Sequence, residues 1–318
     1  MDVQKILNKT IRRHSDKKNF VVAPIFFSTV IVLFIITATN DLETVWKTHR
    51  FPFLDRSVLY SNPNDIIINL SPLRDTLNAI ATEIGTNNIS LYAESLNSGA
   101  NIVVNKDLRI FPFSLAKLPL ALVVMKKVER HELELHDPLE IKAEDQDARS
   151  GTLYQRTPGT KITVDALLKT LLIDSDNTAQ HVLLRNITEG DMGALINETG
   201  LQDLGDQSGR ISAKEYTRFY RTLFFSSFLT PGDSEKILKL LNQATFKDFL
   251  SSGVPAGIPF PHKYGVDVNN KIYLDSGIIY IPNRPMMITV MLQGIDKDQA
   301  HEYMTRIAKE TYNYISTK

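Results

Sequence analysis

The chain has 318 residues, of which 43% are hydrophobic and 23% charged, which is ordinary for a globular protein with one large domain or two small ones. Its 36 Lys and Arg balance 36 Asp and Glu, so the net charge is zero and no nucleic-acid partner is expected. The absence of cysteine excludes disulfides, thiolate metal ligands, a cysteine nucleophile and a lipid-modified N-terminal cysteine.

The N-terminal part has the pattern of a membrane anchor. Residues 1–19 carry six Lys or Arg against two Asp, a local charge of +4, and residues 20–39 contain no charged residue. An apolar run of this length spans a bilayer core of about 30 Å. Because basic flanks stay in the cytoplasm, we expect a cytoplasmic tail over 1–19, a single transmembrane anchor in the cell membrane over 20–39, and an extracytoplasmic remainder. A cleaved signal peptide is the alternative, although no small-residue cleavage site follows the run.

A stalk is expected between the anchor and the folded domain. Residues 40–63 mix charged residues with Pro52 and Pro63 and show no sustained period. Residues 64–318 are predicted to form one mixed domain. It begins with a helix over 71–84, with Ser71 as its N-cap. Strands over 89–96 and 101–104 follow around a tight turn.

The next helix begins at a candidate catalytic pair. Ser114 and Lys117 lie three residues apart, where the apolar run 118–125 begins, which predicts a buried helix with Ser114 in its first turn. Residues at this spacing share a helical face, so the Lys117 amine can be the base that makes the Ser114 hydroxyl a nucleophile. The helix N-terminus favours a developing oxyanion. The same spacing at Ser15 and Lys18 lies in the expected cytoplasmic tail and has no catalytic meaning.

Helices are predicted for the middle of the domain, after a polar, loop-like stretch over 137–162. The expected starts are Thr163, the polar break 174–177, Asp191, Ser212 and Thr230. Ser212-Ala213-Lys214-Glu215 has the pattern of a capping box, in which the serine and the glutamate bond each other's backbone N–H groups.

The end of the chain returns to strands, over 263–267, 272–281 and 286–293, before a closing helix over 296–315. Because strands lie early and late with helices between them, we predict an α+β fold. Both ends of the domain would form an antiparallel sheet flanked by helices, and an all-helical subdomain would be inserted over about 115–250. The cleft between sheet and subdomain is the expected site.

Two polar motifs follow Ser114 in the order that a catalytic site would need. Ser175-Asp176-Asn177 lies in the polar break, where a serine can relay a proton and an asparagine can bind a substrate amide; an N-cap cluster is the alternative interpretation. Lys263-Tyr264-Gly265 begins a late strand, where glycine allows a substrate backbone to approach closely. An exposed lysine in a hairpin is the alternative there.

Together these motifs resemble those of the penicillin-recognising serine enzymes, which share Ser-x-x-Lys, Ser-Asp-Asn and Lys-Thr-Gly. The chain is most similar to class A serine β-lactamases, including the run 175–179, the strand 275–280 and Arg284-Pro285, over about residues 70–316. The resemblance implies a β-lactamase/transpeptidase-like fold. It also implies a serine hydrolase that forms an acyl-enzyme with β-lactams or with acyl-D-Ala-D-Ala peptides of peptidoglycan.

The resemblance further implies a role for each motif residue. Ser114 would be the acylated nucleophile, Lys117 its base, Ser175 the proton donor to the leaving nitrogen, and Asn177 the group that orients the substrate amide and Lys117. Lys263, Tyr264 and Gly265 would contact the substrate, and the N–H groups of Ser114 and Val266 would form the oxyanion hole. We expect burial and the second ammonium of Lys263 to lower the pKa of Lys117, so that it can accept a proton at neutral pH. No cofactor and no metal are expected, because no His, Asp and Glu have ligand spacing.

Two departures from the family pattern bear on turnover. Tyr264 replaces the threonine whose hydroxyl helps to bind the substrate carboxylate. The stretch 200–212 lacks the Glu-x-x-x-Asn pattern whose glutamate activates the deacylating water in class A enzymes. Asp203 and Asp206 are the carboxylates in that stretch, and Glu215 is better explained by the capping box. We therefore expect acylation with slow β-lactam deacylation.

Three functions remain possible on the sequence alone. They are a β-lactamase, a D,D-peptidase that penicillins trap as a stable adduct, and a catalytically silent module that binds the cell wall. The intact Ser114, Lys117, Ser175 and Lys263 favour the first two. His262, beside Lys263, is the histidine considered as a further neighbour of the site.

Overall fold

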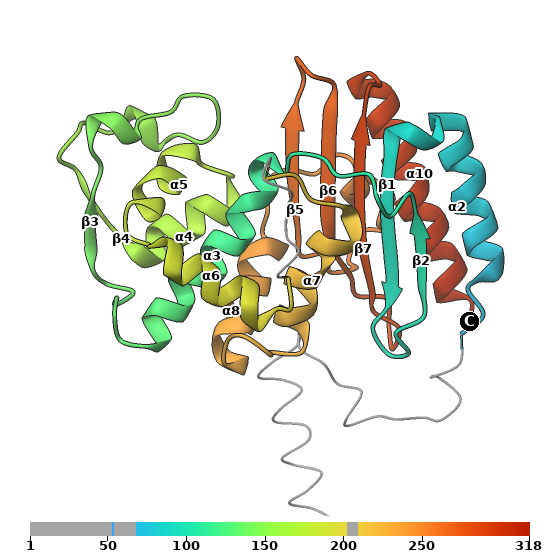
Figure 1. The fold of residues 1–318 in the computed structure, drawn as a ribbon, viewed down its shortest axis with the longest axis horizontal. Helices are drawn as coiled ribbons and strands as arrows, with labels where there is room; N and C mark the ends of the chain where they lie inside the picture. The colour runs from blue at the N-terminus through green and yellow to red at the C-terminus, as the bar shows by residue number, and fades with distance from the viewer. Residues whose placement is uncertain (1–52, 54–67, 202–208) are drawn as a thin grey trace, which may run out of the picture. The chain divides into compact units, whose positions relative to one another are not determined.

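A five-stranded antiparallel sheet forms the centre of the fold, and both ends of the domain contribute to it (Figure 1). Its strands, in the order β2-β1-β7-β6-β5, are β1 (Ile89–Ser95), β2 (Asn101–Val104), β5 (His262–Asp267), β6 (Ile272–Ile279) and β7 (Met286–Gln293). The predicted strands and their antiparallel pairing are confirmed. β7 is a nearly continuous apolar run because both faces of the central strands are covered.

The structure is a computed structural model that describes residue 53, residues 68–201 and residues 209–318. The expected tail and anchor, and the stalk apart from Phe53, lie outside the described residues, so these segments and their boundaries stay predictions. None of the helices in the described ranges is long and apolar enough to cross a bilayer.

One face of the sheet is covered by α2 (Ser71–Ile84) and α10 (Lys297–Ser316) (Figure 1). Their buried side chains recur at helical spacing and join those of the sheet in one core. The predicted N-cap of α2 was wrong. Ser71 is already helical and its side chain makes no capping bond, whereas Asn69 Oδ1 accepts from the Ser71 N–H at 3.0 Å.

The other face is covered by α7 (Ala213–Phe224), whose N-terminus confirms the capping box. Ser212 Oγ accepts from the Glu215 N–H, and the Glu215 carboxylate accepts from the Ser212 N–H at 2.8 Å. Each group satisfies an N–H that the helix itself leaves without an acceptor, which fixes where α7 begins.

The remaining long helices pack against one another beside β5 (Figure 1). They are α3 (Lys117–Glu129), α4 (Val164–Ile173), α5 (Asn177–Leu184), α6 (Glu189–Glu198) and α8 (Pro231–Asn242). Residues 117–125 of α3 are all buried, because the other helices surround its first turns. The stretch predicted as loop contains a small two-stranded sheet, β3 (Pro138–Glu140) and β4 (Lys161–Thr163), whose strands are too short to show a period in the sequence.

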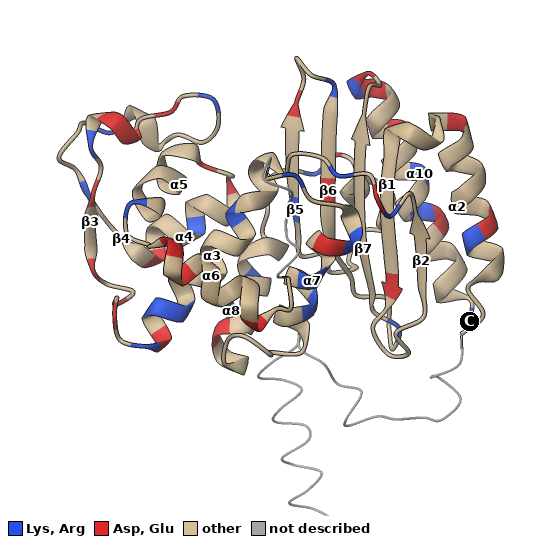
Figure 2. Cartoon of the chain, in the orientation of Figure 1, with Lys and Arg blue, Asp and Glu red and all other residues tan. Residues whose placement is uncertain are grey.

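Short helical turns complete the described elements. They are η2 (Thr86–Asn88), η3 (Phe113–Ala116), η4 (Ala143–Asp145), η5 (Leu153–Gln155) and α9 (Leu250–Gly253). Residues of both charge signs are interspersed over the helices and strands of this part of the chain (Figure 2).

The contact between α9 and α10 gives a test of the packing. A Cβ built at Gly253 would lie 2.2 Å from the Thr305 carbonyl oxygen and 2.8 Å from the Ala308 Cβ. We expect Gly253→Ala to lower the free energy of unfolding by about 1–3 kcal/mol, because this interface has no room for a methyl group. Chemical denaturation measures the change.

Gly193→Ala is the matched control for this substitution. Gly193 also lies in a helix, α6, but a Cβ there meets no atom within 4 Å. Alanine should stabilise that helix by up to about 1 kcal/mol. A Gly253→Ala protein as stable as the parent would contradict the described packing of α9 on α10.

Candidate active site

The Ser114 hydroxyl and the Lys117 amine meet at the start of α3. Ser114 lies in the single 3₁₀ turn η3 that leads into the helix, one turn earlier than predicted. Side chains three residues apart align in a 3₁₀ turn, and Lys117 Nζ lies 3.1 Å from Ser114 Oγ. Phe113, just before the serine, has φ +45°, a conformation that costs a residue with a side chain about 1–3 kcal/mol. The surrounding packing therefore holds this turn against local strain.

The Lys117 amine also contacts the Ser175-Asp176-Asn177 motif. Lys117 Nζ lies 2.6 Å from the Ser175 carbonyl oxygen, 3.1 Å from Ser175 Oγ and 2.6 Å from Asn177 Oδ1. An ammonium has three hydrogens to donate, and four acceptors surround this one. The structure thus brings four predicted site residues together around a single buried nitrogen.

The pKa of the Lys117 amine is lowered to about 8. Burial is the main cause, the carboxylates of Asp176 and Asp147 oppose it, and the Arg149 guanidinium assists it. Burial thus lowers this pKa as expected, and the repulsion between the two amines is found in the pKa of Lys263.

The repulsion between the two lysines lowers the pKa of Lys263. Burial, and then the Lys117 amine, hold the pKa of Lys263 well below its ordinary value. Lys117 has four hydrogen-bond acceptors, whereas Lys263 has one long hydrogen bond among the described residues.

The turn that carries Ser175 is held by its neighbour Asp176. Ser175 has φ +59°, and its side chain and carbonyl both point to Lys117. The Asp176 carboxylate accepts from the N–H groups of Ala179, Thr152 and Leu153 at 2.7–2.9 Å. Asp176 is therefore the N-cap of α5. The N-cap interpretation is thus confirmed for Asp176, while Ser175 and Asn177 contact Lys117 and their catalytic roles stay predictions.

The polar loop 146–152 contributes residues that the sequence analysis missed. The Arg149 guanidinium, and then its backbone N–H and the Asn177 side chain, hold the pKa of Asp147 well below its usual range. Gly151 has φ +85°, and a Cβ there would lie 2.0 Å from Asp176 Oδ2. The sequence did not identify Asp147 and Arg149 as site residues, because they lie in a charged, loop-like stretch and only the tertiary structure brings that loop to Asn177.

Strand β5 presents its open edge to Ser114. It is the last strand of the sheet, and η3 packs against it. The Ile278 N–H donates to the Pro261 carbonyl, and antiparallel pairing alternates. The backbone groups of Tyr264 and Val266 therefore point to the open edge.

Gly265 marks the closest approach of β5 to the serine. A Cβ built on Gly265 would lie 3.4 Å from the Ser114 nitrogen and 3.2 Å from the Pro112 carbonyl oxygen. A larger residue would displace η3 from the strand. The Ser114 nitrogen thus lies close to the open edge of β5, the edge to which the backbone of Val266 points.

The side chains of Lys263 and Tyr264 lie against each other. Lys263 is 1% exposed, its Nζ is 4.6 Å from the centroid of the Tyr264 ring, and its hydrogen bond is to the Tyr264 carbonyl at 3.5 Å. The Tyr264 ring stacks on Phe246 with centroids 3.6 Å apart and planes at 11°. Lys263 makes no hydrogen bond to Ser114, Lys117, Ser175 or Asn177 within the described ranges.

The contacts of His262 lie in the core of the domain. His262 is fully buried, its Nδ1 is 2.9 Å from Asp275 Oδ1, and its ring stacks on Phe260. The structure therefore gives His262 a place in the core.

Of the three carboxylates considered for water activation, Glu215 is the one within the described residues. Glu215 is committed to Ser212 and to Arg109, whose Nη2 lies 2.5 Å from Glu215 Oε1. Asp203 and Asp206 lie outside the described residues. No group of three or more His, Asp or Glu side chains in the described part of the chain is placed to hold a metal ion.

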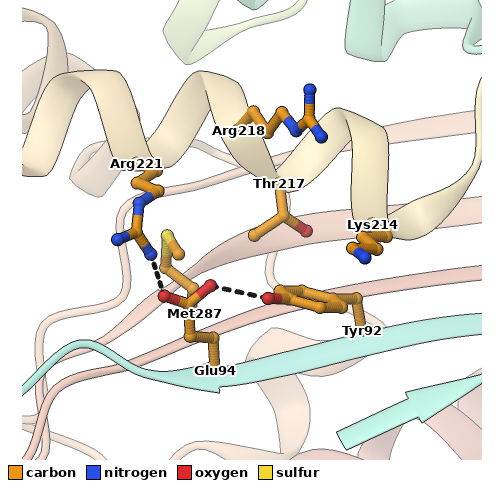
Figure 3. A pocket seen from close by; sticks show the side chains of 7 residues that line it. All are labelled: Tyr92, Glu94, Lys214, Thr217, Arg218, Arg221 and Met287. Carbon is orange, nitrogen blue, oxygen red and sulfur yellow. Dashed lines mark hydrogen bonds and ion pairs between the residues drawn. The ribbon is translucent and has the colours of Figure 1, made fainter. Parts of the chain in front are cut away.

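A separate cavity of about 190 Å³ lies between α7 and the sheet (Figure 3). Its lining residues are Tyr92, Glu94, Lys214, Thr217, Arg218, Arg221 and Met287. Glu94 is bonded to the Tyr92 hydroxyl and to Arg221 (Figure 3). None of these is a motif residue, so the chemistry of Ser114 and Lys117 identifies the candidate active site.

Comparisons with known proteins bear on the family and the fold of the chain. A model described as the β-lactamase enzyme family matches residues 72–315. The β-lactamase VEB-1 of Pseudomonas aeruginosa is 22% identical over 294 residues, which cover 82% of this chain and 95% of VEB-1.

Two solved structures show the same fold. PBP-A has a TM-score of 0.70 at 19% identity, over 78% of this chain and 97% of PBP-A. A β-lactamase of Sphaerobacter thermophilus has a TM-score of 0.71 at 19% identity, over 79% of this chain and 99% of its own. A point mutant of PBP-A has been solved as an acyl-enzyme complex with penicillin G.

The Lys117 environment predicts the pH dependence of Ser114 reactivity. The reaction of Ser114 with an acylating reagent should become faster as the pH rises through about 8, because deprotonation makes Lys117 a base. Asp147→Asn should move the midpoint to lower pH, since the lost carboxylate favours the ammonium. Labelling rates across the pH range measure both effects.

Asp165→Asn is the matched control for this shift. Asp165 pairs with Lys169 and Lys236 and is not among the groups that shift the pKa of Lys117. Its replacement should leave the midpoint unchanged. Equal midpoints for Asp147→Asn and the parent would refute the electrostatic role of Asp147.

The contact between Gly151 and Asp176 gives a further prediction. Gly151→Ala should slow labelling of Ser114 by about tenfold or more, because a displaced Asp176 shifts Ser175 and Asn177 away from Lys117. Gly159→Ala is the control, since Gly159 has a similar φ of +93° but a Cβ there meets no atom within 4 Å. Equal labelling rates for Gly151→Ala and Gly159→Ala would show that contact between a side chain at position 151 and Asp176 does not affect the reactivity of Ser114.

Proposed function

The chain belongs to the β-lactamase enzyme family and is a serine hydrolase, and from this premise we propose that Ser114 forms the acyl-enzyme. The observation that carries the proposal is the position of Lys117 Nζ within hydrogen-bonding distance of Ser114, Ser175 and Asn177. A buried amine with a lowered pKa can take the proton of a serine hydroxyl.

The steps of acylation follow from the contacts of Lys117. Ser114 Oγ attacks the carbonyl carbon and its proton passes to the neutral Lys117 amine. The N–H groups of Ser114 and Val266 stabilise the oxyanion. When the carbon–nitrogen bond breaks, Ser175 gives its hydroxyl proton to the leaving nitrogen and recovers one from Lys117. Water then hydrolyses the acyl-serine ester and restores the hydroxyl.

The proposed substrates are β-lactams or acyl-D-Ala-D-Ala peptides. The β-lactam proposal is supported by the likeness to VEB-1 and by the penicillin G adduct of mutant PBP-A. We further propose that the enzyme is anchored by residues 20–39 with its domain outside the cell membrane, a proposal supported by the charge pattern of the N-terminus.

A D,D-peptidase with slow β-lactam deacylation is the second candidate. The observation that favours it is the commitment of Glu215 to the capping box and to Arg109, which leaves this carboxylate unable to activate water. A catalytically silent module is disfavoured, because burying the amines of both Lys117 and Lys263 costs free energy that binding alone does not require.

Mass spectrometry of the full-length chain with penicillin G tests the function. We expect a covalent adduct that is absent in Ser114→Ala. A lasting adduct supports the peptidase, and a transient one with rapid drug loss supports the β-lactamase. Absence of both adduct and drug loss would refute both enzymes.

Ser15→Ala is the control for the nucleophile, because it removes the serine of the other Ser-x-x-Lys sequence. The Ser15→Ala protein should form the penicillin adduct as the parent does. An adduct that persists in Ser114→Ala would refute the assignment of the nucleophile.

A further inference from the structure

We propose that the part of the cleft beside Tyr264 favours an uncharged leaving group over a carboxylate, so that this enzyme prefers neutral acyl donors to free acids. The inference rests on the proposed function, since it concerns the substrate of the same site. It follows from the position of Tyr264, from the way Lys263 is covered, and from the charges nearby.

The leaving group of a substrate must lie beside Tyr264. The reacting carbonyl is fixed between Ser114 Oγ and the N–H groups of Ser114 and Val266 at the open edge of β5. The leaving nitrogen receives its proton from Ser175, on the helical side. The group bound to that nitrogen therefore lies between Ser175 and the start of β5, where Lys263 and Tyr264 stand.

The cation in this region is not presented to the cleft. Lys263 is 1% exposed, and its amine faces the Tyr264 ring at 4.6 Å. Its hydrogen bond goes to the Tyr264 carbonyl. A carboxylate could contact this amine directly only if the ring moved, and without such contact the desolvation of the carboxylate is poorly repaid.

The ring that covers Lys263 is held in place. Tyr264 and Phe246 stack with nearly parallel planes, and Phe246 packs edge-on against the fully buried Phe249 at 5.2 Å. The stack joins the edge of β5 to the chain between α8 and α9. Moving Tyr264 would break this contact, so the barrier to a carboxylate is built into the packing.

The charges near Tyr264 are also unfavourable for an anion. Burial raises the pKa of the Tyr264 phenol, and the carboxylates of Asp275 and Asp174 raise it further. Lys117 and Asp275 are the charged groups that shift the pKa of Lys263, and the Arg149 guanidinium on the helical side is paired with Asp147. The faces of aromatic rings are themselves negative. A carboxylate placed against the ring would lose water without contacting the Lys263 amine, whereas a neutral group gains contact with the stack.

Benzylpenicillin and its methyl ester test the inference, since they differ only in the carboxylate. In the full-length chain, the ester should acylate Ser114 at least as fast as the acid. Tyr264→Thr, which uncovers Lys263, should raise the acid-to-ester rate ratio tenfold or more. Tyr264→Phe keeps the ring and should keep the parent ratio. A parent enzyme that favours the acid tenfold, or an unchanged ratio in Tyr264→Thr, would overturn the proposal.

Two further measurements keep the inference separate from the proposed function. Calorimetric binding of both compounds to Ser114→Ala measures recognition without acylation. If neither compound acylates the parent, tighter binding of the ester still supports the inference, while tighter binding of the acid or binding of neither overturns it. If Tyr264→Thr does not fold, Phe246→Leu removes the stack and should raise the same ratio, and an unchanged ratio there would also overturn it.

Discussion

The burial of the Lys117 amine is the constraint on which the rest of the site depends. A lysine without water must find acceptors, and here they come from three separate places: the turn before α3, the carbonyl and hydroxyl of Ser175, and the amide of Asn177. The same burial lowers the pKa of Lys117 to about 8, which makes it a usable base. One physical cause thus assembles the site and gives it its chemistry.

The supporting structure keeps those acceptors at their distances. Asp176 ties the turn of Ser175 to the loop 146–152, and that loop approaches closely because Gly151 has no side chain. On the other side, Gly265 allows η3 to lie against the open edge of β5. The site therefore lies where a helical layer and the last strand of a sheet meet, and both must be correctly packed for it to exist.

Much of the fold could be predicted from the sequence, because its signals are local. Helical spacing gave α2 and α10, and the capping box gave the start of α7. The site residues that meet at Lys117 could be proposed from their order and spacing. Predictions failed where a contact between segments distant in the sequence determines the local structure. β3 and β4 are the example, because each forms only by pairing with the other. The start of α2 was also misplaced, because Asn69 rather than Ser71 supplies the acceptor there.

The sequence alone determined the nucleophile and base as candidates, the antiparallel sheet from both ends, and the replacement of the family threonine by Tyr264. Only the tertiary structure decided how far burial lowers the pKa of Lys117, what Asp176 and Asp147 do, and that His262 belongs to the core. It also decided that Tyr264 covers Lys263. The reason is physical: residue type and spacing specify hydrogen-bonding capacity, but burial and the distances between charges exist only once distant segments have packed together.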